Sequence, residues 1–478
     1  MKGFIEGAIR SVCLCGFGRS GAGFSTCFLI LAGLRYTQHF VSDQPMKDLR
    51  ESLERLYALR TFGIKPGLDT TRALLKRLGN PEQSFAAIHV AGTNGKGSVC
   101  AILESVLLKA GLRVGLYTSP HLIRFNERIR VNGLEISDEE LAALFNDMEP
   151  HAAAVSADGR EATFFEFTTA LAFEHFRRRK IQVAVVETGM GGRLDSTNVL
   201  TPLISVITRI GLDHTAHLGA SLELIAGEKA GIIKPGRPVV CGAMPDEAVS
   251  VIRKTAESMK APWISVADSI AVRRVAQDLK GQKVSITGGD VNYGPVTLTL
   301  LGRHQLENCA TAVAALEILA LCGLPAISPE AIRTGLAEAV WPGRLQVLSL
   351  DPPTILDGAH NPDGAQTLAV ALKELVKNRK IALVWGMCDD KDALGFVKAL
   401  GRVVKRCWTV PIDTERSMTE MQRVQIAKTE GWEVSSTSLP LALKEARAWA
   451  LENGGAVCIA GSLYLAGEVL AYETRKED

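Results

Sequence analysis

The residues with the strongest chemical signal form one glycine-rich segment, His89-Val90-Ala91-Gly92-Thr93-Asn94-Gly95-Lys96-Gly97-Ser98. An apolar strand-like run precedes it and an amphipathic helix-like run follows it, which is the setting of a phosphate-binding loop. Small residues let backbone N–H groups approach phosphate oxygens, a lysine offsets their charge, and a hydroxyl can hold Mg²⁺. The strict GxxxxGK[ST] pattern fails, because Val90 replaces its first glycine and Gly97 separates Lys96 from Ser98. We expect residues 93–98 to bind a nucleotide; a glycine turn without a ligand is the alternative.

Polar residues follow further strand-like runs, and ligands bind at the carboxyl ends of parallel strands. Ser119 lies in YTSPHL, although an ordinary Ser-Pro turn would have the same sequence. Glu187 ends a buried run and precedes a glycine turn, which suits a Mg²⁺ ligand; a helix-capping or surface carboxylate is the alternative. His214 and His217 lack a third zinc ligand nearby, so we expect His214 to be functional and His217 to be structural.

Three more positions could bear on the chemistry. Lys229 lies in a predominantly apolar stretch, where composition alone favours a solvated lysine. Asp357 and His360, in the turn LDGAHNP, suit hydrogen bonds to nucleotide hydroxyls or base; a tight left-handed turn with Asn361 as a cap is the alternative. Arg344 could contact phosphates when two domains close, or it could form a plain interdomain salt bridge.

The elements that must position these residues are apolar strand-like runs that alternate with helix-like runs. The first series comprises residues 85–92, 112–119, Gln182–Glu187, Leu203–Thr208 and Pro238–Cys241. The second starts near Leu345 and comprises Thr354–Leu356, Ile381–Trp385, Cys407–Val410, Trp432–Val434 and Val457–Ile459. This pattern is typical of parallel sheets covered on both faces. We expect an α/β fold with an N-terminal P-loop ATPase-like parallel-sheet domain and a smaller C-terminal Rossmann-like domain.

Helical spacing and chain breakers set the domain boundaries. A helix is predicted over Gly302–Ala320 and another from Met46, with its apolar positions at Leu49, Leu53, Leu56 and Leu59. Pro342 and Gly343 in VWPGR predict a hinge. The expected domains are therefore 46–340 and 345–478, joined by a hinge at 341–344.

Composition excludes several classes of protein. The 478 residues suggest two to four domains, and the formal charge of +2 argues against a nucleic-acid partner. No apolar run reaches the roughly 18 residues of a membrane span. Ten dispersed cysteines without a CxxC pair indicate a reducing compartment, and we expect a cytoplasmic protein. Residues 1–45 contain only two acidic residues, and we interpret them as a dispensable or misassigned leader; an organelle address or export signal is the alternative.

The order of motifs resembles one known family. The segments are HVAGTNGKGS, TSPHL, TFFEF, VETGMGGRLDSTN, LDH, EKAGI, GRHQLEN, WPGR and DGAHNP, from about Met46 to the C-terminus. Together they resemble folylpolyglutamate synthase and dihydrofolate synthase, the folate branch of the Mur-type ATP-dependent amide ligases. The resemblance implies a Mur-ligase-like ATP-binding domain and a C-terminal glutamate-ligase domain. It also implies ligation of L-glutamate through an acyl phosphate.

The resemblance assigns roles to individual residues. Residues 93–98 are similar to the family's phosphate loop, and Lys96, Lys229 and His214 resemble its catalytic groups. Mg²⁺, as two ions, would be held by Ser119, Glu187 and His214. Lys229 matches a lysine that is carbamylated in the family, which replaces the solvated reading. The positions that resemble nucleotide and interdomain contacts are Asn308, Arg344, Asp357 and His360. Those that resemble the pterin site are Thr163, Phe165 and Asp195, where an aromatic ring can stack on the heterocycle.

The leading hypothesis is a bifunctional enzyme. It is motivated by the set of motifs and by the segment TFFE, which resembles that of bacterial bifunctional members. Its partners would be ATP, L-glutamate, dihydropteroate and reduced folates, and we expect a monomer. A polyglutamate-only ligase, a cell-wall Mur ligase and a regulatory P-loop NTPase are the alternatives. No residue is identified as the acceptor of the glutamate amine proton.

Overall fold

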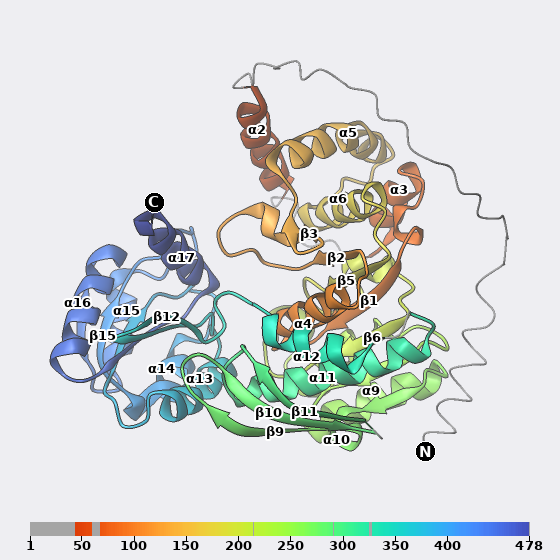
Figure 1. The fold of residues 1–478 in the computed structure, drawn as a ribbon. Coiled ribbons are helices and arrows are strands. Elements are labelled where there is room, and N and C mark those ends of the chain that lie inside the picture. Colours follow the sequence, from red (N-terminus) through yellow and green to blue (C-terminus); the bar gives the residue numbers. More distant parts are fainter. Residues whose placement is uncertain (1–43, 60–66, 214, 290, 325–326, 478) are drawn as a thin grey trace, which may run out of the picture.

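The structure, a computed structural model, describes residues 44–59, 67–213, 215–289, 291–324 and 327–477. The leader interpretation of residues 1–45 therefore lies almost wholly outside the described residues. The described chain forms two lobes, the first drawn from red to teal and the second in blue in Figure 1.

An eight-stranded sheet forms the centre of the first lobe, in the order β4-β3-β2-β5-β1-β6-β7-β8. The strands from β2 to β8 in this order run parallel, and β3 and β4 add an antiparallel edge. Their bounds are β1 (Ala86–Ala91), β2 (Val114–Tyr117), β3 (Ile129–Val131), β4 (Leu134–Glu135), β5 (Val183–Glu187), β6 (Ile204–Ile207), β7 (Val239–Cys241) and β8 (Trp263–Ser265). The strands predicted for the first series are confirmed, and their Val- and Ile-rich composition reflects burial on both faces.

Helices cover both faces of this sheet. Side chains in β1 alternate, so that Ile88 and Val90 join the cluster under α4 while Ala87 joins the cluster under α6. The helices and 3-10 turns of this lobe are α2 (Gln44–Ala58), α3 (Asp69–Arg77), η2 (Pro81–Gln83), α4 (Lys96–Lys109), η3 (Phe125–Arg128), α5 (Asp138–Ala157), α6 (Phe164–Arg178), η4 (Ser196–Val199), α7 (Thr215–Leu218), α8 (Leu222–Ala230), α9 (Asp246–Ser258), α10 (Val266–Ser269), α11 (Arg303–Leu321) and α12 (Pro329–Glu338). The helices predicted from Met46 and over Gly302–Ala320 are α2 and α11.

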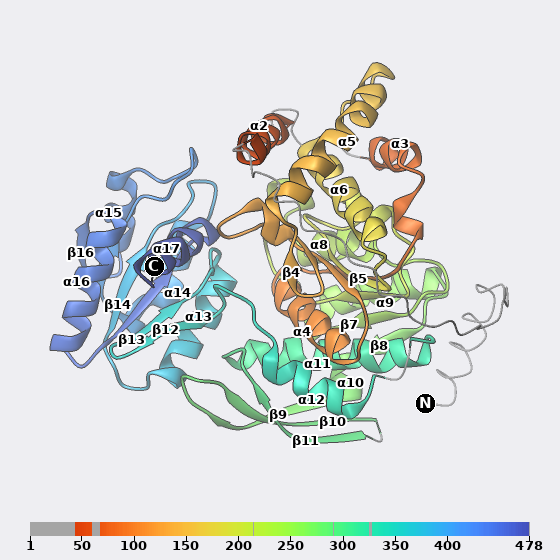
Figure 2. The ribbon, with the colours of Figure 1, turned by 45° about the horizontal axis from the view of Figure 1, so that its top comes forward.

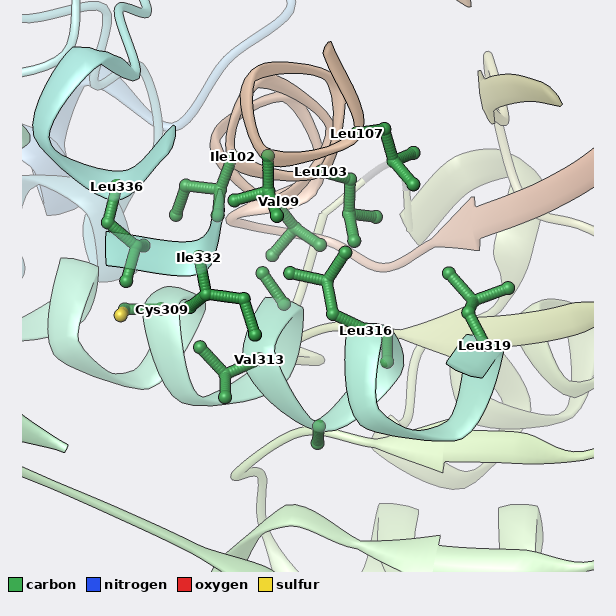
Figure 3. Packing of buried hydrophobic residues seen from close by; sticks show 14 of the residues in the cluster. Val99, Ile102, Leu103, Leu107, Cys309, Val313, Leu316, Leu319, Ile332 and Leu336 are labelled. Atoms are coloured by element: carbon green, nitrogen blue, oxygen red, sulfur yellow. The ribbon is translucent and has the colours of Figure 1, made fainter. Parts of the chain in front are cut away.

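The helix that carries the glycine-rich loop, α4, is fixed by packing rather than by exposed contacts. Figure 3 shows Val99, Ile102 and Leu103 of α4 facing α11 and α12. All three side chains are fully buried, and each such aliphatic side chain contributes about 1.5–3 kcal/mol relative to exposure. The start of α4, where the loop ends, is thus held by a dry three-helix contact.

A three-stranded antiparallel sheet also belongs to the first lobe, and no strand was expected there from the sequence. It consists of β9 (Ile270–Gln277), β10 (Gln282–Gly288) and β11 (Val291–Leu298), in the order β11-β10-β9. Burial alternates along β10, so only one face of this sheet packs against the lobe. In these strands polar residues interrupt the apolar ones, so they lack the continuous apolar runs that identify the parallel strands. The sequence therefore did not predict this sheet.

The second lobe contains a six-stranded sheet in the order β12-β13-β17-β14-β15-β16, with β12 antiparallel. Its strands are β12 (Gln346–Leu350), β13 (Pro353–Leu356), β14 (Ile381–Trp385), β15 (Val404–Thr409), β16 (Glu433–Ser436) and β17 (Ala456–Ala460). Its helices and 3-10 turn are α13 (Pro362–Leu375), α14 (Ala393–Leu400), η5 (Gly401–Val403), α15 (Glu420–Lys428), α16 (Leu439–Glu452) and α17 (Leu463–Glu477). The expected second parallel sheet is confirmed, with β15 starting at Val404 rather than at Cys407.

The two lobes contact each other beyond their covalent connection. Glu374 on α13 pairs with Arg303 at the start of α11 and, at 2.8 Å, with Arg274 on β9. Leu279, after β9, packs against the apolar cluster of the second lobe. The unexpected antiparallel sheet therefore helps to hold the second lobe beside the first (Figures 1 and 2).

Candidate functional site

The glycine-rich loop lies between β1 and α4, as expected. The Lys96 ammonium donates hydrogen bonds to the carbonyl oxygens of Gly92 (3.0 Å) and Thr93 (3.2 Å). The Thr93 hydroxyl donates to the carbonyl of Gly211 at 3.0 Å, after β6. The Asn94 amide donates to Asp363 of the second lobe at 2.8 Å. The loop is thus tied to a neighbouring strand end and to the other lobe.

The rest of the loop is packed against α11 and the hinge. A Cβ on Gly95 would come within 2.3 Å of the Asn308 side-chain oxygen, and one on Gly97 within 2.6 Å of the Trp341 ring. The Ser98 hydroxyl accepts a hydrogen bond from Gln305 at 3.1 Å, and Gln305 in turn accepts one from Asn308 at 2.9 Å. Asn308 therefore lies beside the loop.

Glu187 and Ser119 meet at the carboxyl ends of β5 and β2. The Ser119 backbone N–H donates to Glu187 Oε2 at 3.3 Å, and Glu187 Oε1 lies 3.9 Å from Lys96 Nζ. Burial raises the pKa of the Glu187 carboxyl, while the Lys96 ammonium acts against this rise. Because Glu187 is buried, the alternative of a surface carboxylate is wrong.

The oxygen-rich donor set at this point fits a hard cation better than zinc. Glu187 offers a carboxylate, and Ser98 and Ser119 offer hydroxyls from adjacent segments. Among the described residues, no group of three or more His, Cys, Asp and Glu side chains could hold a metal ion on its own. A cation bound here would therefore share its coordination with oxygens of a bound substrate, which is how Mg²⁺ usually binds beside phosphates.

Lys229 on α8 is 4% exposed, so the reading as a solvated lysine is wrong. Its ammonium donates to the Gly92 carbonyl at 2.8 Å, directly beneath the phosphate-type loop. Burial, reinforced by the nearby charge of Lys96, lowers the pKa of Lys229 to about 7. Lys96 and Lys229 also line one cavity together with Thr188 and Asp213.

His214 lies outside the described residues, and His217, expected to be structural, is exposed. The adjacent Asp213 is described and faces the second lobe. Its carboxylate accepts hydrogen bonds from Lys391 (3.2 Å) and Asn361 (3.3 Å), and His360 Nε2 lies 3.8 Å away. Residues after β6 and after β13 are thus brought to one place between the lobes.

The turn after β13 is stabilised by hydrogen bonds from backbone N–H groups to its own side chains. Asp357 accepts hydrogen bonds from the backbone N–H groups of Leu345 (2.9 Å) and Ala359 (2.8 Å). Of the alternative for this turn, the Asn361 cap is confirmed, since its side chain accepts from the Gly364 N–H at 2.8 Å, whereas residues 357–361 contain no left-handed residue. Arg344 makes no ion pair within the described part of the chain. The interdomain salt bridge suggested for Arg344 is therefore not found there. Burial raises the pKa of Glu187, and the charge of Arg344, like that of Lys96, acts against this rise.

The residues that resemble a pterin site surround the glycine turn after Glu187. Phe165 is 41% exposed and lies against Gly189. Asp195 accepts hydrogen bonds from the N–H of Met190 (2.9 Å) and of Thr197 (3.0 Å), which fixes this turn. Thr163 caps α6 through a reciprocal pair of hydrogen bonds with Glu166. The Phe165 ring is partly exposed, whereas Asp195 and Thr163 chiefly hold the backbone around it.

Comparison with known proteins decides the family. The Mur ligase middle domain matches residues 90–316, and the glutamate ligase domain of Mur ligases matches residues 343–463. The Bacillus subtilis dihydrofolate synthase/folylpolyglutamate synthase is 44% identical over 358 residues, which cover 74% of this chain and 83% of that relative. The chain belongs to the dihydrofolate synthase/folylpolyglutamate synthase family of Mur ligases.

Solved structures of this family have the same fold. Mycobacterium tuberculosis folylpolyglutamate synthase complexed with ADP and AMPPCP is similar, with a TM-score of 0.84 and 31% identity, over 90% of this chain and 99% of that chain. Escherichia coli FolC in complex with DHPP and ADP is similar, with a TM-score of 0.81 and 33% identity, over 91% and 100%. The expected fold class and the ligase class are confirmed. No helix in the described ranges combines the length and apolar character needed to cross a bilayer.

Several residues of this candidate site were not predicted from the sequence. Gln305 could have been found, because it lies one helical turn before Asn308 on α11. Lys391 follows the carboxyl end of β14, where the strand-end rule would place a ligand-facing residue. Trp341 lies in the WPGR segment, but neither it nor Asp363 could be placed beside the loop, since these contacts join segments far apart in the chain.

Proposed function

We propose that this family member uses ATP to ligate L-glutamate to dihydropteroate and to add further glutamates to reduced folates. The observation that carries the proposal is the juxtaposition of Lys96, Glu187 and Lys229 beneath one glycine-rich loop that faces the second lobe. The ADP and DHPP named for the Escherichia coli relative support nucleotide and pteroate substrates.

The reaction needs an activated acceptor, because a carboxylate cannot expel an oxide ion. Transfer of the γ-phosphoryl group to the acceptor carboxylate forms an acyl phosphate and releases ADP; the neutral glutamate amine then attacks the acyl carbon and phosphate departs. The backbone N–H groups of residues 93–98 and the Lys96 ammonium would bind the phosphates. Arg344 would approach them from the hinge and His360 from the second lobe.

Mg²⁺ would be held by Glu187 and by the hydroxyls of Ser98 and Ser119, and we propose His214 as a further ligand. When bound, it offsets the charge of the phosphate oxygens. Glu187 suits this role because it is buried beside Lys96 and is held by the Ser119 N–H.

We propose that Lys229 is carbamylated. Addition of CO₂ to its neutral amine forms an N–C bond and releases one proton, which converts the side chain into an anion. The lowered pKa of Lys229 supports this chemistry, because only the unprotonated amine reacts. The resulting carboxylate would lie next to Lys96 and could support a second Mg²⁺ ion.

The acceptor would lie over the glycine turn after β5. Phe165 would stack on the pterin ring, while Asp195 and Thr163 would shape the backbone around it. Asn308 and Asp357 would contact the nucleotide.

The chain organisation follows the same proposal. An ATP-binding domain at 46–340 and a glutamate-ligase domain at 345–478 would close about a hinge at 341–344, and the enzyme would act as a monomer. The ten dispersed cysteines, none of them in a CxxC pair, support a cytoplasmic location.

The deciding experiment gives the purified full chain ATP, Mg²⁺, L-glutamate and either dihydropteroate or tetrahydrofolate. We expect ADP and phosphate release with both acceptors, and products heavier by one or more glutamyl groups. Turnover with tetrahydrofolate alone would favour a polyglutamate-only ligase. Nucleotide hydrolysis that neither acceptor stimulates would favour a regulatory NTPase and overturn the proposal.

A further inference from the structure

The loop after β2 reaches from the first lobe to the second. Figures 1 and 2 both show this orange segment extending toward the blue lobe. The Leu122 side chain packs against the apolar cluster that underlies α16 and α17. It also lies near the hinge, since a Cβ on Gly343 would be 3.4 Å from its Cδ1 atom.

The Leu122 backbone makes an even closer approach. A Cβ on Gly467, within α17, would meet the Leu122 carbonyl oxygen at 1.9 Å and its carbon at 2.7 Å. No side chain fits there unless the loop or the helix moves. Glycine at this position therefore lets the loop backbone rest directly on α17.

The loop itself is held in one conformation by Glu127. Its carboxylate accepts hydrogen bonds from the backbone N–H groups of Leu122 (2.7 Å), Ile123 (2.6 Å) and Arg124 (2.7 Å). Hydrogen bonds to an ionised carboxylate are stronger than neutral ones. Three residues before Leu122, the Ser119 N–H donates to Glu187. Because hydrogen bonds hold both ends of this short segment, a displacement of the Leu122 backbone also displaces Ser119.

We propose that Leu122 is a positioning residue. Through its contact with Gly467 it docks the loop that follows β2, which carries Ser119, onto the second lobe. Docking of this loop fixes the position of one lobe relative to the other. It also fixes the position of Ser119 beside Glu187. The inference rests on the proposed function only for its effect on turnover; the docking contact stands independently of the substrate.

The test compares Leu122→Asp with Ile123→Asp in the full chain. Ile123 is the matched control, because it is the next residue, its amide has the same partner, and its side chain is 50% exposed. Hydrogen–deuterium exchange without substrates reports docking. We expect faster exchange in α17 and in residues 119–128 for Leu122→Asp only. Identical exchange in the two variants would overturn the proposal.

Steady-state kinetics provide the second readout, at a temperature where circular dichroism shows both variants folded. We expect Leu122→Asp to lower kcat/KM at least about tenfold, with a higher KM for ATP, since small misplacements of reacting groups are costly. If Leu122→Asp does not fold, Leu122→Ala and Gly467→Leu replace it. Gly467→Leu pushes on the same contact from the other lobe and must produce the same exchange pattern.

The two proposals can fail separately. A wild-type chain that does not turn over folate acceptors refutes the proposed function and leaves the exchange result intact. An active wild type with unchanged exchange in all Leu122 and Gly467 variants refutes the docking role alone.

Discussion

The protonation of Lys229 offers the sharpest quantitative test of the site. An ordinary lysine, with a pKa near 10.4, is only about 0.1% neutral at pH 7.5. Burial and the charge of Lys96 lower the pKa of Lys229 to about 7. At pH 7.5 about three-quarters of Lys229 would then be neutral, and at pH 6 about one tenth. Carbamylation at a fixed CO₂ pressure should therefore collapse between these two pH values.

The assay is carbon-13 NMR of the full chain under labelled CO₂. We expect a carbamate resonance that is absent from Lys229→Gln and present in Lys234→Gln. Lys234 is the matched control, because burial also lowers its pKa, to about 8, but it bonds to Asn198 away from the loop. A resonance that persists in Lys229→Gln would refute the assignment, as would a wild type without one at pH 8.

Protein stability provides an independent check in CO₂-free buffer. Because the pKa of Lys229 is lower in the folded than in the unfolded chain, the unfolded chain binds more protons between pH 7 and 10.5. The burial penalty is full below pH 7 and is relieved as pH rises through this window. The free energy of unfolding of wild type, relative to Lys229→Gln, should rise by about 2 kcal/mol from pH 6 to 8.5. A flat difference would mean that the amine is not buried as described.

Three further substitutions test other parts of the site. Glu187→Gln removes the buried carboxylate beside Lys96 and should lower kcat about 10²–10³-fold, while calorimetry should still detect Mg²⁺-free ADP binding; unchanged turnover would exclude Glu187 from the metal site. Phe165→Leu removes a half-exposed ring and should raise the KM for dihydropteroate about fivefold with little change in Tm; an equal rise in the KM for ATP would count against stacking. Gly97→Ala forces a Cβ to within 2.6 Å of the Trp341 ring and should raise the KM for ATP and lower Tm, and an added Trp341→Ala should relieve both effects if the clash is their cause.

The parallel strands and the main helices could be predicted because their signals are local. Runs such as VAVVE and IALVW are apolar throughout, which reflects strands buried on both faces. The antiparallel strands β9 to β11 were missed, because they bury one face and their apolar residues alternate with polar ones. In the second sheet, β12 begins at Gln346, next to Leu345, where the second series was expected to start.

Environment changed the meaning of several residues that were correctly singled out. Lys229 looks like a solvated lysine by composition, and only its place beneath Gly92 makes it a buried amine. Asp195 and Thr163 resemble pterin-site positions. In the structure, however, Asp195 accepts hydrogen bonds from backbone N–H groups and Thr163 caps α6. Side-chain partners of this kind come from segments that meet only after folding.

The sequence by itself determined three things: the presence of the phosphate-type loop, the positions along the chain of the strands that carry functional residues, and the family. These depend on residue type and short spacing, which strand-to-helix geometry converts directly into position. The tertiary structure alone decided which groups face one another across the lobes: the Asn94 and Asp363 side chains, the Asp213 and Lys391 side chains, and the Leu122 backbone with Gly467. Such pairs are separated by well over a hundred residues, so their proximity follows from how two sheets pack, and no local pattern encodes it.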